Sequence, residues 1–231
     1  MKRFWQDVFV EQVDGGFRVL LDTRPLRTQG GAPQVVPTRA LAEALAEEWR
    51  AQADEVDPAS FPLRDSADFA IDHVGADRER VIDGLLRFAE TDTLCYRADP
   101  DEPLFARQQQ LWEPVLADAE KRLGVQFLRI SGIIHHPQPA ATMDRLRAEL
   151  RGLDNFTLAA VQALAPVAAS LTVALAVLQP GADATQLFAV SNAEEDWQAE
   201  QWGWEWTAEE LRARRLASFL AAARFAELVR G

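Results

Sequence analysis

Carboxylates and amides alternate with large indole side chains between Asn192 and Gly203. The spacing predicts a helix over residues 184–202. One stripe of that helix collects five residues at steps of three and four: Phe188, Ser191, Glu195, Gln198 and Trp202. A stripe that only packed into a core would be apolar throughout, whereas the middle of this one is polar. Aromatic surface excludes water and strengthens the hydrogen bonds of a neighbouring carboxylate. The pattern is therefore typical of a surface that binds the backbone or an arginine of a protein partner.

A purely structural interpretation competes with this one. In it, Phe188 and Trp202 belong to the core and the polar residues between them form a solvated edge. Four acidic residues crowd the same segment, too close in sequence to form a catalytic pair with distinct environments: Glu194, Glu195, Asp196 and Glu200. The residues alone leave the binding surface and the solvated edge open as alternatives.

Other chemistry is sparse in this sequence. Neighbouring side chains of an extended segment point to opposite faces, so the pair His135-His136 does not predict a metal site. The phosphate-binding motifs G-x-x-x-x-G-K-[ST] and G-x-G-x-x-G do not occur in the sequence. Ser131-Gly132 lacks the preceding glycine of the turn that exposes a nucleophilic serine. We therefore expect no metal, no cofactor and no catalytic residue.

An enzyme is kept as the alternative function. It would be a small-molecule enzyme with its pocket between two domains, and its first candidate residues are His135, Asp72 and Tyr96.

The charge and the cysteine content of the chain limit the classes of partner and the cell compartment that we expect. The 36 acidic and 24 basic residues give a formal charge of -12, which disfavours nucleic acid and anionic membrane surfaces. The single cysteine, Cys95, excludes an internal disulfide and is expected to be a small buried hydrophobe. No apolar run opens the chain, so we expect no signal peptide and a location in the bacterial cytoplasm, or in the mitochondrial matrix for an organellar protein.

Residues 156–178 carry no charge and are long enough to cross a membrane. Polar residues and Pro166 interrupt the stretch, and no basic flanks fix an orientation. We expect one buried helix there and no stable membrane insertion.

The fold class expected is α+β. Residues 8–13 and 17–22 alternate around Asp14-Gly-Gly16 as a hairpin, and Leu26–Thr28 is the expected third strand. Thr38 is the expected N-cap of a covering helix. From there helical periodicity dominates over 66–74, 77–89, 104–123, 140–150, 156–178, 184–202 and 207–229, with a strand-like interruption at 125–130. We expect a small α+β domain over residues 1–60 and a mainly helical domain over 61–231.

Several sequence blocks together resemble a known family. The blocks are Phe4-Trp5, residues 19–28, 62–72 and 93–97, Trp112-Glu-Pro114, and above all Trp197-Gln-Ala-Glu-Gln-Trp-Gly203. Taken in this order and spacing, they are similar to the ATP synthase assembly chaperones that hold the free alpha subunit of the soluble catalytic head.

The resemblance implies a chaperone without enzymatic activity that shields the beta-subunit interface of the unassembled alpha subunit until the ring forms. It places the family's functional acid on Glu195, with Glu194 as the neighbour that a one-residue shift would select. The client-binding residues implied are Glu195, Glu194, Gln198, Trp202 and Trp197. The sequence departs from the family pattern after Gly203, where Trp204 and Trp206 either widen the contact surface or fill a local core.

Overall fold

The computed structural model describes residues 2–132 and 134–231 and separates them into two compact units. One unit contains Met1–Val81, Asp154–Ala160 and Ala221–Gly231, and the other contains Ile82–Leu153 and Val161–Leu220. The expected α+β class is confirmed, because a small antiparallel sheet precedes a larger set of helices. The domain boundary after residue 60 stays a prediction, since compactness does not show which segments fold independently.

A three-stranded antiparallel sheet opens the first unit in the order β1-β2-β3. The predicted hairpin is confirmed, with β1 over Val8–Val13 and β2 over Gly16–Leu21. Gly16 has to be a glycine, because an added Cβ would lie 2.2 Å from the backbone oxygen of Val36. The third strand, β3, is Arg24–Pro25, two residues earlier than expected, since the chain reverses at Asp22 in the left-handed region.

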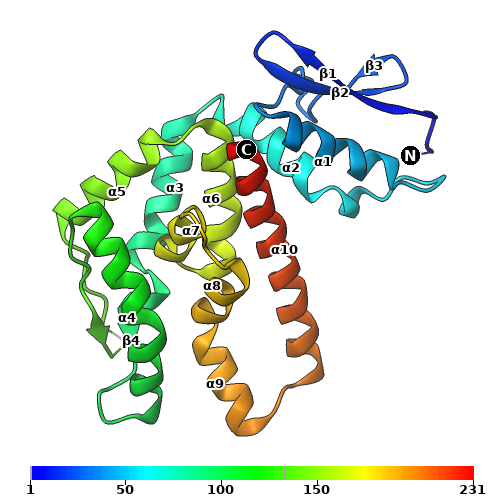
Figure 1. The fold of residues 1–231 in the computed structure, drawn as a ribbon. Helices are drawn as coiled ribbons and strands as arrows, with labels where there is room; N and C mark the ends of the chain where they lie inside the picture. Colours follow the sequence, from blue (N-terminus) through cyan, green and yellow to red (C-terminus); the bar gives the residue numbers. More distant parts are fainter. Residues whose placement is uncertain (1, 133) are drawn as a thin grey trace. The chain divides into compact units, whose positions relative to one another are not determined.

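Helix α1, Arg39–Arg50, covers the β1–β2 face of the sheet (Figure 1). The Thr38 hydroxyl accepts a hydrogen bond from the backbone N–H of Leu41, so the predicted N-cap is confirmed. Three short elements follow: η1 (Pro58–Ser60), α2 (Pro62–Phe69) and the π-helical turn η2 (Ala70–Val74). The start of α2 has no local side-chain cap. The carboxylate of Glu48 on α1 caps α2 instead, by accepting hydrogen bonds from the N–H groups of Leu63 and Arg64.

Helices dominate the rest of the chain. In order they are α3 (Arg78–Glu90), the single turn η3 (Thr93–Cys95), α4 (Pro103–Leu123), α5 (Ala140–Gly152), α6 (Asn155–Ala168), α7 (Leu171–Val177), α8 (Ala184–Ser191), α9 (Ala193–Trp202) and α10 (Trp206–Arg230). Two short strands, β4 (Tyr96–Arg97) and β5 (Ile130–Ser131), pair in parallel. The strand-like stretch 125–130 therefore forms a strand only at its last residue.

The single helix expected over residues 156–178 was wrong, because α6 and α7 are separate helices. Ala169 has a φ of 47°, a conformation that ends α6. The buried hydroxyl of Ser170 then starts α7 by accepting a hydrogen bond from the N–H of Val173. The expectation that this region is buried is correct, and no helix of the described residues has the length and apolar content to cross a membrane.

The single helix expected over residues 184–202 was also wrong. Asn192, with φ −107° and ψ 18°, interrupts the helical backbone between α8 and α9. The predicted stripe is therefore not continuous. Phe188 and Ser191 are buried on α8, whereas Gln198 and Trp202 on α9 are exposed. The structure therefore contradicts two expectations. Trp202 is not a core residue, and Phe188 and Trp202 do not lie on one continuous seam.

Candidate functional site

Helix α9 is fixed to its neighbours by polar side chains rather than by an apolar stripe. Three of its four acidic residues form ion pairs with arginines of adjacent helices. The carboxylate of Asp196 accepts from both Nε and Nη2 of Arg212 at 2.7 and 2.6 Å. Glu195 pairs with Arg215 at 3.0 Å, and Glu200 pairs with Arg107 at 2.6 Å. The solvated-edge interpretation thus fits these three residues poorly, because each connects α9 to α10 or α4.

Glu194 differs from the other three acids of α9. Its carboxylate accepts a 2.6 Å hydrogen bond from the side-chain amide of Gln108, and it forms no ion pair with any residue that the structure describes. Burial raises the pKa of Glu194, and the hydrogen bond from Gln108 opposes that rise. Glu194 is thus a half-buried carboxyl group with no cation paired to it among the described residues.

Gln108 positions this carboxylate, and the sequence analysis missed it. The side chain is fully buried, and its Oε1 accepts a 2.8 Å hydrogen bond from the N–H of Ala98. Because a backbone N–H can only donate, this bond fixes the amide orientation and turns its NH₂ group toward Glu194. A signal was present in the sequence: Gln108 shares one face of α4 with Trp112 and Leu116, so it is a polar residue on an otherwise apolar stripe.

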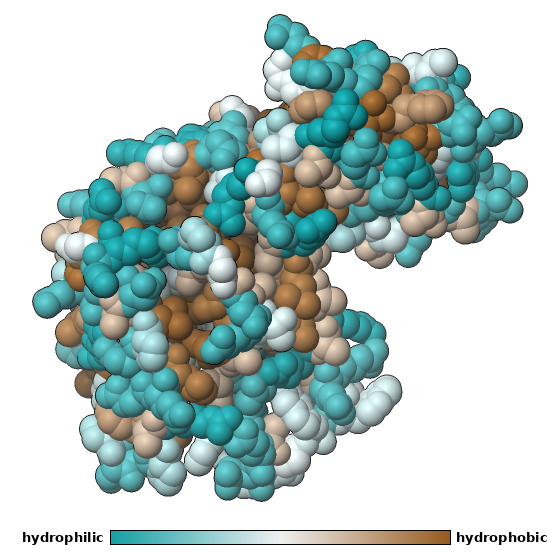
Figure 2. Space-filling model, viewed as in Figure 1, coloured by the Kyte–Doolittle hydropathy of each residue, from teal (hydrophilic) through white to brown (hydrophobic). Residues whose placement is uncertain are grey.

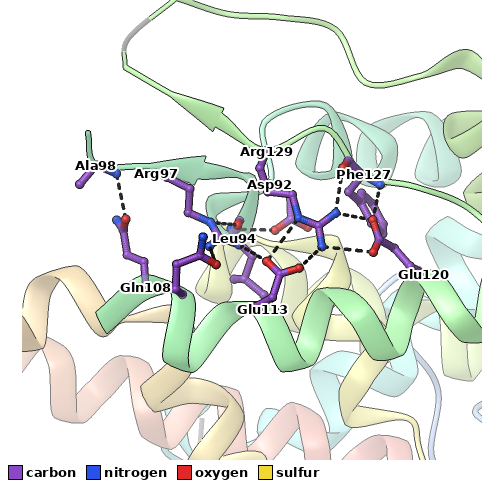
Figure 3. Close-up of polar contacts among 10 residues, drawn as sticks. Asp92, Leu94, Arg97, Ala98, Gln108, Glu113, Glu120, Phe127 and Arg129 are labelled. Carbon is purple, nitrogen blue, oxygen red and sulfur yellow. Dashed lines mark hydrogen bonds and ion pairs between the residues drawn. The ribbon is translucent and has the colours of Figure 1, made fainter. Parts of the chain in front are cut away.

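An ion-pair network holds α4 beside the β4–β5 pair (Figure 3). Arg97 on β4 contacts Glu113 at 3.1 Å, and Arg129 contacts the same carboxylate at 2.5 Å and also pairs with Glu120. Arg129 beside it keeps the pKa of Glu113 below its ordinary value. The network fixes the end of β4 relative to α4, and with it the Ala98–Gln108–Glu194 chain of hydrogen bonds.

A pocket of about 450 Å³ lies in front of Glu194. It is lined by Thr91, Thr93, Tyr96, His135 and Glu194. The Tyr96 hydroxyl lies 2.7 Å from Nδ1 of His135. Two candidates of the alternative enzyme thus come together here beside an acid that had been assigned to partner binding.

The remaining candidates for chemistry have structural partners. Asp72 belongs to the first compact unit, where its carboxylate accepts hydrogen bonds from Thr28 and from the N–H of Gly30. Cys95 is fully buried, as predicted, and burial raises the pKa of its thiol far above the ordinary value, which leaves it unreactive. The described residues contain no group of three His, Cys, Asp or Glu side chains able to hold a metal ion.

Indole side chains crowd the turn between α9 and α10. Trp202 is 80% exposed and Trp206 is 75% exposed, while Trp204 is 40% exposed and lies under the guanidinium of Arg212. Gly203, with a φ of 82°, makes the turn. Trp197 is half-buried beneath Arg107, and Gln198 next to it is exposed. The indoles at 202, 204 and 206, which we call the indole corner, therefore form outer surface rather than a local core.

A second concave surface lies between α4 and α8, where Figure 2 shows apolar side chains gathered in a hollow. Its volume is about 450 Å³. Its apolar lining includes Leu111, Pro114, Val115, Ala176, Leu187 and Val190. Asp118 and Asp183 also line this groove and add negative charge to it.

These features are typical of a protein-binding surface: large aromatic rings exposed to solvent, acidic surroundings, and an apolar groove. A family model described as ATP12 chaperone protein matches residues 2–120, which is 119 of the 231 residues. The chain belongs to the ATP12 chaperone family, the family of ATP synthase assembly chaperones that its sequence resembles.

Individual relatives agree with this assignment. The mitochondrial protein atp12 of Schizosaccharomyces pombe is 28% identical over 233 residues, covering 96% of this chain and 80% of that protein. The crystal structure of Atp12 from Paracoccus denitrificans is 40% identical, with a TM-score of 0.93 over 99% of this chain and 98% of that one. The Atu1473 protein from Agrobacterium tumefaciens is 39% identical, with a TM-score of 0.93 over 98% and 85%. A mitochondrial and two bacterial relatives agree with the location expected from the sequence.

Proposed function

We propose that this chaperone binds the unassembled alpha subunit of the ATP synthase soluble head and shields its beta-subunit interface until the ring forms. Membership of the ATP12 family is the observation that carries the proposal. The indole corner supports it, because exposed aromatic patches on a folded protein usually mark an interaction surface.

The proposed client-binding residues all lie on α9: Glu194, Glu195, Gln198, Trp197 and Trp202. Their surroundings suggest different contributions. Trp202 and Gln198 are exposed and can contact the client directly. Glu195 is already paired with Arg215, so we assign it the positioning of α9 against α10. Glu194 has no cationic partner of its own among the described residues, which leaves it free to receive one from the client.

A mechanism without catalysis or ATP follows from these surfaces. Aromatic and apolar area covers the client's apolar interface, while the net charge of -12 discourages association between copies of the chaperone. When the beta subunit arrives, its larger interface competes for the same client surface and displaces the chaperone by mass action.

Co-expression tests the proposal. The alpha subunit produced without its beta partner is expected to aggregate alone and to stay soluble, in a complex that elutes as one peak, when this chain is co-expressed. A test variant replaces Trp202 and Trp206 by serine, which removes the exposed rings without altering buried side chains, and it should keep less alpha subunit soluble than the wild type. Equal alpha solubility with and without the chaperone would reject the function, and a copurifying metabolite or metal would favour the enzyme instead.

A further inference from the structure

We propose that the pocket in front of Glu194 receives one arginine side chain of the client. The inference rests on the proposed function and deepens it, because it names the chemical group that the acidic end of α9 recognises. The pocket, the unpaired carboxylate and the rigid support behind it are independent observations that lead to the same group.

Charge is the first argument. Asp196, Glu195 and Glu200 each have an arginine of this chain within 3.0 Å, so their charges are already offset. Glu194 has only the neutral amide of Gln108. A half-buried carboxylate that keeps its charge without a cation costs free energy in the isolated protein. A cation from a partner would remove that cost, so the partner group should be positive.

The choice of a guanidinium over an ammonium is the second argument. A guanidinium is planar, weakly hydrated and able to donate several hydrogen bonds at once, which suits a partly desolvated site. Glu194 offers a carboxylate acceptor, and the aromatic residue Tyr96 is among the residues that line the same pocket. An aromatic ring adds attraction for a cation that lies over its face. A lysine ammonium is more strongly hydrated and would lose more on entering.

Preorganisation is the third argument. The Glu194 carboxylate is held from behind by Gln108, whose own amide is fixed by the N–H of Ala98. Tyr96 and His135, which line the same pocket, hold each other through a 2.7 Å contact between the Tyr96 hydroxyl and Nδ1 of His135. A site whose walls are already ordered loses little conformational entropy when a side chain enters. This arrangement favours binding over a purely structural role for Glu194.

The test uses the full chain and N-acetyl-arginine amide as the probe, with binding followed by NMR at the imidazole of His135. We expect saturable shifts with the wild-type protein and at least tenfold weaker binding in Glu194→Gln. Glu227→Gln is the matched surface control, because this exposed acid pairs with Arg224 and is not among the residues that line the pocket. The neutral citrulline analogue should not bind, and the lysine analogue should bind more weakly than arginine.

Equal probe affinity in wild type and Glu194→Gln would overturn the inference, as would binding of the citrulline analogue at arginine's strength. Capture of the purified alpha subunit separates this failure from failure of the proposed function. If the wild type and Glu194→Gln capture alpha equally, the arginine pocket is wrong and the chaperone function stands. If the wild type fails to capture alpha while the probe still binds at Glu194, the function is wrong and the pocket stands.

Discussion

Replacing Gln108 by leucine tests whether one buried amide positions the acidic site. The side chain is fully buried and forms one hydrogen bond at each end, to the N–H of Ala98 at 2.8 Å and to the carboxylate of Glu194 at 2.6 Å. Leucine has a similar size and a comparable helix propensity, so the change removes the two hydrogen bonds with little alteration of α4 itself.

The expected cost comes mainly from the partners that are left unpaired. Leaving a buried polar group without a hydrogen bond costs about 1–3 kcal/mol, and more when that group is charged, while the leucine side chain recovers part of this through apolar burial. We expect a net loss of about 2 kcal/mol in the free energy of unfolding. For a chain of this length that loss corresponds to a fall of about 4–8 °C in Tm.

The assay is thermal and urea unfolding followed by circular dichroism. Gln110→Leu supplies the control, because Gln110 lies on the same helix but is exposed, and its replacement should change stability by less than about 0.5 kcal/mol. In a Glu194→Gln background the cost of Gln108→Leu should shrink, since the acceptor left behind is then neutral. The reasoning is refuted if Gln108→Leu and Gln110→Leu unfold at the same temperature.

Three further predictions concern the same unit. Ser170→Ala removes the buried N-cap of α7 and should lower the free energy of unfolding by about 1 kcal/mol in urea titrations. Burial raises the pKa of Glu194, so the folded protein binds the proton of this carboxyl group more tightly than the unfolded chain does. The wild type should therefore lose stability relative to Glu194→Gln as pH rises from 4.5 through the pKa of the folded state. In urea unfolding, Glu194→Gln should therefore equal or exceed the wild type in stability at pH 7 and lose this advantage toward pH 4. The double variant Trp202→Ser and Trp206→Ser should keep the wild-type Tm within about 2 °C, because both rings are exposed, yet elute with less alpha subunit from a sizing column.

Local sequence signals predicted the elements whose structure depends on neighbouring residues. The hairpin follows from alternation around Asp14-Gly15, and α1 follows from the Thr38 cap with its apolar positions. The two helix interruptions could not be predicted in the same way. Ala169 and Asn192 are not strong helix breakers, and each break is stabilised by distant groups. The Asp92 carboxylate accepts from the N–H of Thr172 near the start of α7, and Arg215 donates to the side chain of Asn192 at 2.6 Å.

The client-binding site on α9 stays a prediction of the sequence, and the contacts of its individual residues could not be predicted. Composition and family resemblance both directed attention to the acids and indoles of α9. They could not distinguish Glu194 from Glu195, because the distinction depends on which acid an arginine twenty residues away reaches. They also missed Gln108, whose importance comes from two contacts across the fold. Whether Trp204 and Trp206 form surface or a local core likewise could be decided only from the exposed fraction of each ring in the structure.

The most direct test of the proposed chaperone function is displacement. Purified alpha subunit bound to a fluorescently labelled form of this chain is titrated with beta subunit while fluorescence anisotropy reports the bound fraction. The account predicts tight binding to free alpha, no binding to free beta, and loss of the anisotropy signal in step with ring formation. A chain that binds beta as tightly as alpha, or that stays attached to the completed head, would contradict it.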